Sequence, residues 1–264
     1  MEIKVLFSPS DEVQAVQLQK KCDVKDLSMD TSLNCSKDLP PFYECYENGK
    51  LVSFLTLFFP HEGEVEATAF TDPAFRGQGF FGLLVKKAAE QSLRCGFQKM
   101  IFAIEGESES GKAAVKHFPA SYSFSEYAMK LDSVNAPVSR LPRITLEKAT
   151  EELYAQLESE PLIQTPQRIM YIAMENGRPV GHAALCPDGD DIWIYHLCIA
   201  SPLRGKGLGE SLMRALIEEA HPRKPILEVD TNNIPALSLY MKLGFKPVST
   251  MDYFSMDLRA FKEC

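Results

Sequence analysis

A glycine-rich loop precedes an amphipathic stretch in the C-terminal half of the chain. The sequence SPLRGKGLGESLMRAL, residues 201–216, has glycines at 205, 207 and 209, and an apolar run with helical spacing follows. Glycine destabilises a helix interior, so three glycines just before a helix need another explanation. Small residues let the backbone approach a ligand, and the N–H groups at a helix start attract negative charge. The loop therefore predicts an anion site.

The spacing of these glycines matches neither of two common phosphate-binding loops. A dinucleotide loop needs GxGxxG and an acidic residue about 20 positions later, whereas here the helix begins too early. A P-loop needs GxxxxGK[ST], which this stretch does not contain. The pattern that fits begins at Arg204 and reads R-x-x-G-x-G.

The same pattern occurs twice in the chain. FTDPAFRGQGFFGLLVKKAAEQ covers residues 70–91, and IASPLRGKGLGESLMRALIEEA covers residues 199–220. Arg76 and Arg204 hold the same place in the two copies and lie 128 positions apart, the difference between 204 and 76. This separation is about one domain length, so we interpret the repeat as a duplicated domain.

The flanks of the two loops predict the elements that position them. Each copy reads as a strand, an Asn-Gly turn, a second strand, a loop and a third strand that ends at the glycine loop. Asn48-Gly49 and Asn176-Gly177 are strong hairpin turns, because both residues of such a pair tolerate a positive φ. A helix, a further strand, a short helix and a closing pair of strands follow.

This order predicts an α/β fold in which each half is a mixed, mostly antiparallel sheet flanked by helices. The strand–helix–strand unit requires a right-handed crossover, with the glycine loop at the carboxyl end of its first strand, where ligands of such sheets bind. We expect an N-terminal domain over residues 1–132 and a C-terminal domain over residues 144–264. Residues 133–143 contain two prolines and no periodicity, and are interpreted as a linker.

The second half resembles the GCN5-related N-acetyltransferases, abbreviated GNAT. Their pyrophosphate loop, [RQ]-x-x-G-x-[GA], is matched by Arg204, Gly207 and Gly209. Their later motif, roughly N-x-x-A-x-x-L-Y-x-K-x-G-F, is matched by Asn233, Ala236, Leu239, Tyr240, Lys242, Gly244 and Phe245. The resemblance is close over residues 143–264 and looser over residues 1–132, and it implies two tandem GNAT-type domains.

The resemblance implies that the anion is acetyl-CoA, bound as a substrate and without a metal. Its pyrophosphate would lie on the N–H groups of residues 204–209, and its pantetheine would pair with the backbone of Leu197 and Ile199. In the family this strand carries a bulge and separates from its neighbour. The residues implied in cofactor binding are Leu197, Cys198, Ile199, Arg204, Gly205, Lys206, Gly207, Leu208, Gly209, Asn233, Ala236 and Tyr240. Asn233 has a second interpretation as an ordinary helix N-cap.

Three residues are candidates for the chemistry. Tyr240 matches the tyrosine that protonates the leaving thiolate in the family, and its alternative is a packed aromatic with a backbone partner. Glu228, in ILEVDT, resembles the base of ribosomal-protein N-terminal acetyltransferases, and its alternative is an interface or solvent-facing glutamate. His196 is the rival base, because its ordinary pKa suits the task. Strand alternation places His196 on one face with Ile194 and Cys198, which favours a core histidine.

The first half departs from the family pattern. Arg76, Gly77, Gln78 and Gly79 form the candidate second CoA site, although Phe81 stands where the family has glycine or alanine. We expect Phe81 to pack into the sheet and leave the loop intact.

The later motif is weaker in the first half. Aligning residues 122–124 with residues 243–245 puts Phe118 or Pro119 in the place of Tyr240, so no phenol is available there. Tyr122 and Tyr127 are the candidate substitutes. We expect the N-terminal domain to be catalytically weak or inactive.

Composition excludes several classes of protein. The net charge of −8 argues against nucleic-acid binding. No apolar run reaches the roughly 18 residues of a membrane helix, and MEIKVLFSPS does not read as a secretory signal. The seven cysteines form no CxxC pair, so we expect reduced, mostly buried thiols in the cytoplasm. The five histidines show no metal-ligand spacing.

These observations favour an N-acetyltransferase that moves an acetyl group from acetyl-CoA to an amine of a small molecule or a peptide. The catalytic site would lie in the C-terminal domain, with Tyr240 as general acid, in a monomer or a homodimer. The alternative is an acyl-CoA-binding or sensing protein without turnover. A third hypothesis is a structural partner protein that keeps the fold and not the ligand, and the retained Arg204 with its glycines argues against it.

Overall fold

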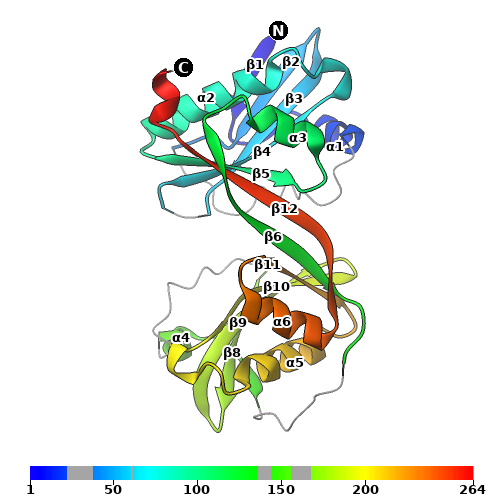
Figure 1. Ribbon diagram of the computed structural model, residues 1–264, viewed down its shortest axis with the longest axis vertical. Coiled ribbons are helices and arrows are strands. Elements are labelled where there is room, and N and C mark those ends of the chain that lie inside the picture. The colour runs from blue at the N-terminus through cyan, green and yellow to red at the C-terminus, as the bar shows by residue number, and fades with distance from the viewer. Residues whose placement is uncertain (23–37, 61, 136–143, 156–167, 264) are drawn as a thin grey trace. The chain divides into compact units, whose positions relative to one another are not determined.

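The computed structural model describes residues 1–22, 38–60, 62–135, 144–155 and 168–263 (Figure 1). The chain divides into two compact units. Unit 1 comprises Met1–Ser125 and Met251–Cys264, and unit 2 comprises Glu126–Thr250. Each unit is a mixed, mostly antiparallel sheet flanked by helices, as the sequence predicts.

The sheet of unit 1 has the strand order β1-β2-β3-β4-β5-β12. Its strands are β1 (Glu2–Leu6), β2 (Phe42–Glu47), β3 (Lys50–Phe58), β4 (Glu64–Thr71), β5 (Lys99–Glu105) and β12 (Phe245–Asp257). Strands β4 and β5 are parallel, and the other neighbouring pairs are antiparallel. Strand β12 belongs to this sheet through residues 251–257, which pair with β5 (Figure 1).

Helices cover both faces of the unit 1 sheet. They are α1 (Glu12–Lys21), the 3-10 turn η1 (Pro73–Phe75), α2 (Phe80–Arg94), α3 (Glu109–Val115) and the 3-10 turn η3 (Ala260–Glu263). The main core lies under α2, whose Leu84, Val85 and Ala88 are fully buried, and it includes Met256 of β12. A smaller core lies under α1, where Leu18 packs with strand residues.

Unit 2 repeats this arrangement with the order β6-β11-β10-β9-β8-β7. Its strands are β6 (Ala120–Leu131), β7 (Thr145–Lys148), β8 (Ile169–Glu175), β9 (Arg178–Asp188), β10 (Asp191–Ile199) and β11 (Lys224–Asp230). Strands β10 and β11 are parallel, and the other neighbours are antiparallel. Strand β6 belongs to this sheet through residues 126–130, which pair with β11.

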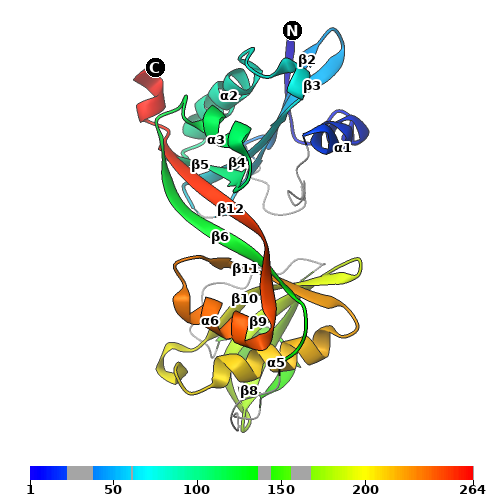
Figure 2. The ribbon, with the colours of Figure 1, turned by 45° about the vertical axis from the view of Figure 1, so that its right-hand side comes forward.

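The helices of unit 2 are α4 (Glu151–Ala155), the 3-10 turn η2 (Ser201–Leu203), α5 (Leu208–Ala220) and α6 (Ile234–Leu243). Helices α5 and α6 lie side by side in both ribbon views (Figure 2). The apolar face of α5, with Leu212 and Leu216 fully buried, packs on the strands and on α6 residues such as Leu243. The core of unit 2 therefore fixes both helices against the sheet.

Equivalent contacts recur in the two units and confirm the duplication. The predicted Asn-Gly turns join β2 to β3 and β8 to β9, and Asn48 and Asn176 share a φ of 51°. Tyr43 donates a hydrogen bond of 2.8 Å to Gln91 in unit 1. Tyr171 donates one of 2.7 Å to Glu219 at the corresponding positions of unit 2.

The units do not follow the contiguous halves expected from the sequence. Each half sends its last strand to the other unit, so the unit bounds fall inside β6 and β12. The exchange gives β5 and β11 an antiparallel partner at an edge that would otherwise be open. One long strand, and not the expected closing pair, follows each short helix. Residues 136–143 of the expected linker lie outside the described residues.

The cysteines only partly match expectation. The described ones are free thiols, but Cys45 alone among them is buried, and Cys95 is exposed. Among the described residues, no helix is both long and apolar enough to cross a membrane.

Candidate functional site

Strand β10 carries a bulge near its carboxyl end. Its register with β9 shifts between Tyr195 and Cys198, so β10 contains an extra residue there. His196 lies in this bulge and adopts a φ of 51°, in the left-handed region that side chains rarely occupy. The bulge confirms the feature that the family resemblance implies for this strand.

A glycine on the neighbouring strand makes room for the bulge. Gly181 of β9 pairs with Ile199. A Cβ atom at position 181 would lie 2.3 Å from the carbonyl oxygen of Cys198, which is too close for any side chain. Sequence reasoning missed Gly181, although its counterpart 128 positions earlier is Ser53, a difference that could have drawn attention to it.

Beyond the bulge, β10 separates from β11. The two strands pair from Asp191 to Ile194 on β10, whereas β10 continues to Ile199. Backbone groups of residues 195–199 on that side therefore face a gap in the ladder. An extended ligand chain could pair with them as a further strand would.

The glycine loop lies directly after this strand end. Gly205 and Gly207 have φ values of 77° and 82°, which glycine adopts without strain. Gly207 is the N-cap of α5 and no side chain caps the helix. The first N–H groups of α5 have no partner within a helix, so the helix start is suited to an anion.

Arg204 holds the loop against the strand. Its Nε donates a hydrogen bond of 3.0 Å to the carbonyl oxygen of Ile199, and its Nη2 lies 3.9 Å from Cys198 Sγ. The guanidinium is otherwise exposed, as is the neighbouring Lys206. Arg204 thus fixes the loop and leaves positive charge at its surface.

Tyr240 lies on α6 and is buried in the core of unit 2. Its ring packs against Phe245 at 6.0 Å between centroids, and it belongs to the same core as Leu208, the first residue of α5. Burial raises the pKa of its phenol, so the hydroxyl keeps its proton at neutral pH. Within the described part of the chain, no hydrogen bond engages this hydroxyl.

Glu228 lies on β11, on the sheet face opposite the buried Leu227 and Val229. Its side chain is exposed at the surface, yet partial desolvation of the carboxyl raises its pKa to about 7. The negative charge of Glu126 on the adjacent strand β6 adds to this shift. A carboxyl group with this pKa can accept a proton near neutral pH.

His196 is not on the buried face of β10, which corrects the expectation from strand alternation. Ile192 and Ile194 are buried, but the extra residue of the bulge shifts the alternation, so Ile199 is buried and His196 is exposed. His196 Nε2 lies 3.2 Å from Nη1 of Arg168. Because arginine only donates, this nitrogen accepts the hydrogen bond, which occupies the lone pair that a base would use.

Other implied cofactor residues lie on β10, on α5 and at the start of α6. Asn233 is the N-cap of α6 and accepts a hydrogen bond of 3.3 Å from the Ala236 N–H, so its capping interpretation is confirmed. Gly209 faces α6, where a Cβ would lie 3.6 Å from Leu239. Leu197 is partly buried and packs against the core of unit 2.

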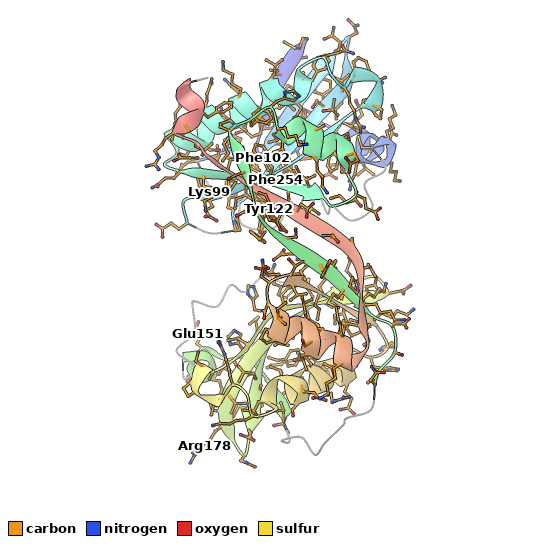
Figure 3. All side chains as sticks on the ribbon, viewed as in Figure 1. Lys99, Phe102, Tyr122, Glu151, Arg178 and Phe254 are labelled. Atoms are coloured by element: carbon orange, nitrogen blue, oxygen red, sulfur yellow. The ribbon has the colours of Figure 1, made fainter. Side chains whose placement is uncertain are left out.

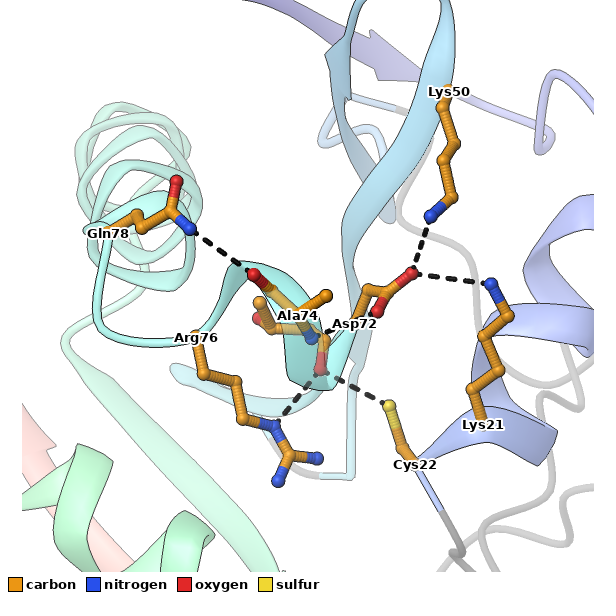
Figure 4. A network of polar contacts seen from close by, with 8 residues as sticks. Lys21, Cys22, Lys50, Asp72, Ala74, Arg76 and Gln78 are labelled. Carbon is orange, nitrogen blue, oxygen red and sulfur yellow. Dashed lines mark hydrogen bonds and ion pairs between the residues drawn. The ribbon is translucent and has the colours of Figure 1, made fainter.

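Unit 1 builds a loop with the same backbone geometry (Figure 4). Gly77 and Gly79 have φ values of 74° and 85°, and Gly79 is the uncapped N-cap of α2. Arg76 Nε donates a hydrogen bond of 3.2 Å to the carbonyl oxygen of Thr71, to which Cys22 Sγ also donates. Gln78 donates to the carbonyl oxygen of Ala74.

A buried carboxylate supports this loop and has no counterpart in unit 2. Asp72 accepts from the ammonium groups of Lys50 and Lys21 at 2.8 and 3.3 Å (Figure 4). It also accepts from the N–H of Ala74. These hydrogen bonds lower the pKa of Asp72, and the bond from Lys50 contributes most. The residue at the same place in unit 2 is Ala200.

Unit 1 lacks the strand bulge of unit 2 and a tyrosine at the place of Tyr240. Strand β4 pairs with β3 from Glu66 to Thr71 without a shift of register, so β4 has no bulge. Tyr122, a candidate substitute for Tyr240, packs on Phe254 at 5.9 Å between centroids (Figure 3). Tyr127, the other candidate, packs against the core of unit 2. Neither lines the cavity beside the unit 1 loop, and no other tyrosine among the described side chains does.

No metal site is evident in the described chain. These residues contain no group of three or more histidine, cysteine, aspartate or glutamate side chains placed to hold a metal ion.

Three characterised or named proteins are similar to parts of this chain. Over 89 residues it is 33% identical to a protein of Bacillus subtilis (strain 168) whose name proposes a ribosomal protein bS18-alanine N-acetyltransferase. Over 61 residues it is 39% identical to mycothiol acetyltransferase of Corynebacterium jeikeium. Over 98 residues it is 33% identical to aminoglycoside N(6')-acetyltransferase type 1 of Klebsiella pneumoniae.

These matches are partial. They take in 33%, 22% and 31% of this chain, and 59%, 17% and 49% of the respective relatives. The chain therefore spans less than two thirds of each relative.

Solved structures share the whole fold. A GCN5-related N-acetyltransferase from Sphaerobacter thermophilus has a TM-score of 0.74 at 16% identity, over 97% of this chain and 95% of that chain. A tandem GNAT protein from the clavulanic acid biosynthesis pathway has a TM-score of 0.67 at 17% identity, over 97% and 98%.

The family comparison agrees with the duplication. The model of the acetyltransferase (GNAT) family matches residues 12–118 and again residues 139–245. Together these segments cover most of the chain. The chain therefore belongs to the acetyltransferase (GNAT) family and carries two copies of its domain in tandem.

Proposed function

We propose that unit 2 is an N-acetyltransferase that moves an acetyl group from acetyl-CoA to an amine of a small molecule or a peptide. One observation carries this proposal: the bulged end of β10 and the uncapped start of α5 are held together by the bond from Arg204 to Ile199. A gap in a β-ladder beside an anion site suits a ligand with an extended amide chain and a pyrophosphate.

In this proposal the N–H groups of Leu208, Gly209 and Glu210 receive the pyrophosphate, and the exposed side chain of Lys206 adds positive charge. The pantetheine arm pairs with the backbone of β10 near Leu197 and Ile199. The acetyl carbonyl then lies at the bulge, where a backbone N–H can stabilise the oxyanion that forms on attack.

The reaction forms one C–N bond and breaks one C–S bond. The amine nitrogen attacks the thioester carbonyl carbon, and the coenzyme leaves as a thiolate. Tyr240 donates its phenolic proton to that sulfur as the C–S bond breaks. The nitrogen that has attacked carries one proton more than the amide product, and it releases this proton to solvent. The tyrosinate recovers a proton from solvent, so the phenol is restored after each turnover.

The acceptor must also lose a proton. A lysine-like amine has a pKa near 10.4 and arrives as an ammonium ion. Glu228 is the proposed base, because a pKa of about 7 leaves about half of the carboxyl groups ionised at pH 7, and the ionised form can accept a proton, directly or through water. His196 is the weaker choice, since Nε2 already accepts from Arg168.

Calorimetry and a thiol-release assay test this proposal. Acetyl-CoA should bind unit 2 with a stoichiometry of one, and an amine panel should release free CoA thiol. Arg204→Glu should abolish binding by unit 2. Tyr240→Phe should keep binding and lower kcat by about 100-fold or more, the usual range for general acid catalysis. Arg178→Glu, on the exposed β8–β9 turn, is the matched charge-reversal control (Figure 3).

The outcomes of these assays distinguish an acetyltransferase from a protein that binds acyl-CoA without turnover. Binding that depends on Arg204, together with thiol release on adding an amine, supports the enzyme. Binding without thiol release from any amine would favour the acyl-CoA-binding alternative. Absence of binding would contradict both.

A further inference from the structure

Unit 1 contains a cavity of about 550 Å³ that the proposed acetyl transfer does not use. Strands β4 and β5 pair as far as Ala67 and Phe102, and then both continue along the cavity wall. The rest of the wall comes from the Arg76 loop, the first turn of α2, and α3. Small-molecule sites usually measure about 300–1,000 Å³, so this cavity has the size of a ligand site.

The wall has two chemically different parts. Its exposed part carries Arg76, Ser110 and His117, with the half-buried carboxylate of Glu105 also in the wall, and Arg76 Nη1 lies 3.3 Å from Ser110 Oγ. Its buried part is apolar and includes Phe102 and Val115. A ligand that fits both parts has a negatively charged end and an apolar end.

Three phenylalanine rings define the apolar part. Phe102 and Phe118 stack at 5.6 Å between centroids, and Phe81 meets Phe118 edge-on at 5.5 Å. Phe81 occupies the position of Gly209 in unit 2, and it packs against the sheet without closing the loop, as expected. The rings offer an apolar surface where unit 2 has a small residue.

The cavity lacks what transfer would need. Its lining, among the described side chains, contains no tyrosine and so no phenol to protonate a thiolate. Strand β4 is not bulged, and Ser53 stands where Gly181 allows the bulge in unit 2, with Ser53 Oγ 2.9 Å from Thr71 Oγ1. A side chain at this position is compatible only with a regular strand pair.

We infer that the cavity of unit 1 binds a coenzyme A thioester whose acyl group is larger and more apolar than acetyl, and that it holds this thioester without transferring the acyl group. The exposed loop at Arg76 receives the phosphates, the pantetheine arm passes Phe81, and the acyl group lies against Phe102 and Phe118. Acetyl would leave most of the apolar wall without contact. The second CoA site of this chain is thus a site for a different thioester.

Two cysteines report on the two units in one experiment. Cys22 lines the cavity of unit 1, and Cys198 lies beside Arg204 in unit 2. The full chain is labelled with N-ethylmaleimide in the presence of octanoyl-CoA, acetyl-CoA, free octanoate or no ligand. Peptide mass mapping then gives the labelling rate at each cysteine.

Octanoyl-CoA should slow labelling at Cys22 at a concentration at least about tenfold below that of acetyl-CoA, since each buried methylene adds affinity. Acetyl-CoA should protect Cys198. Equal protection of Cys22 by octanoate alone, or none by octanoyl-CoA at millimolar concentration, would overturn the inference. Failure of the proposed transferase would appear separately, as unprotected Cys198 and no thiol release.

Gly82 offers a way to fill the cavity. It lines the cavity on α2, and a Cβ there would meet no atom within 4 Å. Gly82→Leu should abolish protection of Cys22 and leave protection of Cys198 unchanged. Leucine has a higher helix propensity than glycine, so α2 should still form in this variant. Gly82→Ala is the matched control and should keep most of the protection. Undiminished protection of Cys22 in a folded Gly82→Leu variant would place the ligand elsewhere.

Discussion

The carboxylate of Glu210 on α5 forms an ion pair with the ammonium of Lys242 on α6. Glu210 is 7% exposed and also binds Arg214 at 3.0 Å. Arg214 in turn donates to the carbonyl oxygen of Asn135, whose side chain donates to the carbonyl oxygen of Lys242. The helix that begins at the glycine loop is thereby fixed to the helix that carries Tyr240.

Glu210→Gln tests this link. The variant keeps the shape of the side chain but removes the charge that both cations need, so it should lower the free energy of unfolding by roughly 1–3 kcal/mol, the range for charge-assisted bonds. Chemical denaturation measures the change. Because α5 and α6 both shift, kcat of acetyl transfer should fall more than KM for acetyl-CoA rises.

The ion pair between Glu210 and Lys242 should make the stability of unit 2 depend on pH in the acid range. Bonds from Lys242, and then from Arg214, hold the pKa of Glu210 below its ordinary value of 4.5. A lowered folded-state pKa contributes stability above the ordinary value, and this contribution is lost as pH falls through the folded-state value. The stability difference between the wild type and Glu210→Gln should therefore shrink below pH 4.5. A constant difference down to pH 3 would exclude the ion pair as its cause.

Gly181→Ala should disrupt the bulge of β10. The added methyl group meets the Cys198 carbonyl oxygen, a backbone atom that cannot move aside cheaply. Overpacking of this kind costs about 1–3 kcal/mol, and the displaced strand should cut kcat/KM of acetyl transfer more than tenfold. Ser53→Ala, at the matched position of unit 1, should leave transfer unchanged. Similar losses in both variants would show that the effect is one of general stability.

Much of this site could be predicted from residues alone, and the bulge shows where prediction stops. The loop at Arg204 follows from local spacing, since glycine freedom and helix starts are local properties, whereas Tyr240 was singled out through the family resemblance. Strand alternation wrongly placed His196 in the core, because one inserted residue reverses every later side chain. Only the pairing with β9, through Gly181, shows where that residue lies.

The exchange of closing strands between the two units could not be predicted from the sequence, because it also depends on strand pairing. Strands β6 and β12 end the two copies of the same domain, and β6 pairs with β11 whereas β12 pairs with β5. Which edge each strand joins depends on pairing across more than 100 residues, for example Phe254 with Phe102. The cavity of unit 1 was equally hidden, because Phe118 alone does not reveal that space remains beside it.

Gly207→Ala and Gly79→Ala compare the two loops directly. Each places a methyl group on a residue with φ above 80°, which costs about 1–2 kcal/mol in an L residue. The first should raise KM for acetyl-CoA and reduce protection of Cys198. The second should reduce protection of Cys22 by octanoyl-CoA. The labelling rates of both cysteines are measured in both variants. Loss of Cys22 protection in Gly207→Ala, or of Cys198 protection in Gly79→Ala, would contradict the separation of the two sites.

Glu228→Gln should change the pH profile of transfer. With a lysine-like acceptor, the reactive pair is the carboxylate and the bound ammonium, so kcat/KM should rise about tenfold per pH unit below 7 and level off above it. The glutamine variant has no base and depends on free amine, whose pKa lies near 10.4. The kcat/KM of this variant should be lower than that of the wild type, and it should keep rising from pH 7 to pH 9 without levelling off.

Stability gives an independent check on the same carboxyl group. A folded-state pKa raised from 4.5 to about 7 means that the folded protein holds a proton that the unfolded chain has lost. The contribution of Glu228 to stability therefore falls as pH rises between these values. Unfolding measured at pH 5 and pH 8 should show a larger loss for the wild type than for Glu228→Gln. Equal losses would leave Glu228 with an ordinary pKa and return the role of base to His196 or to water.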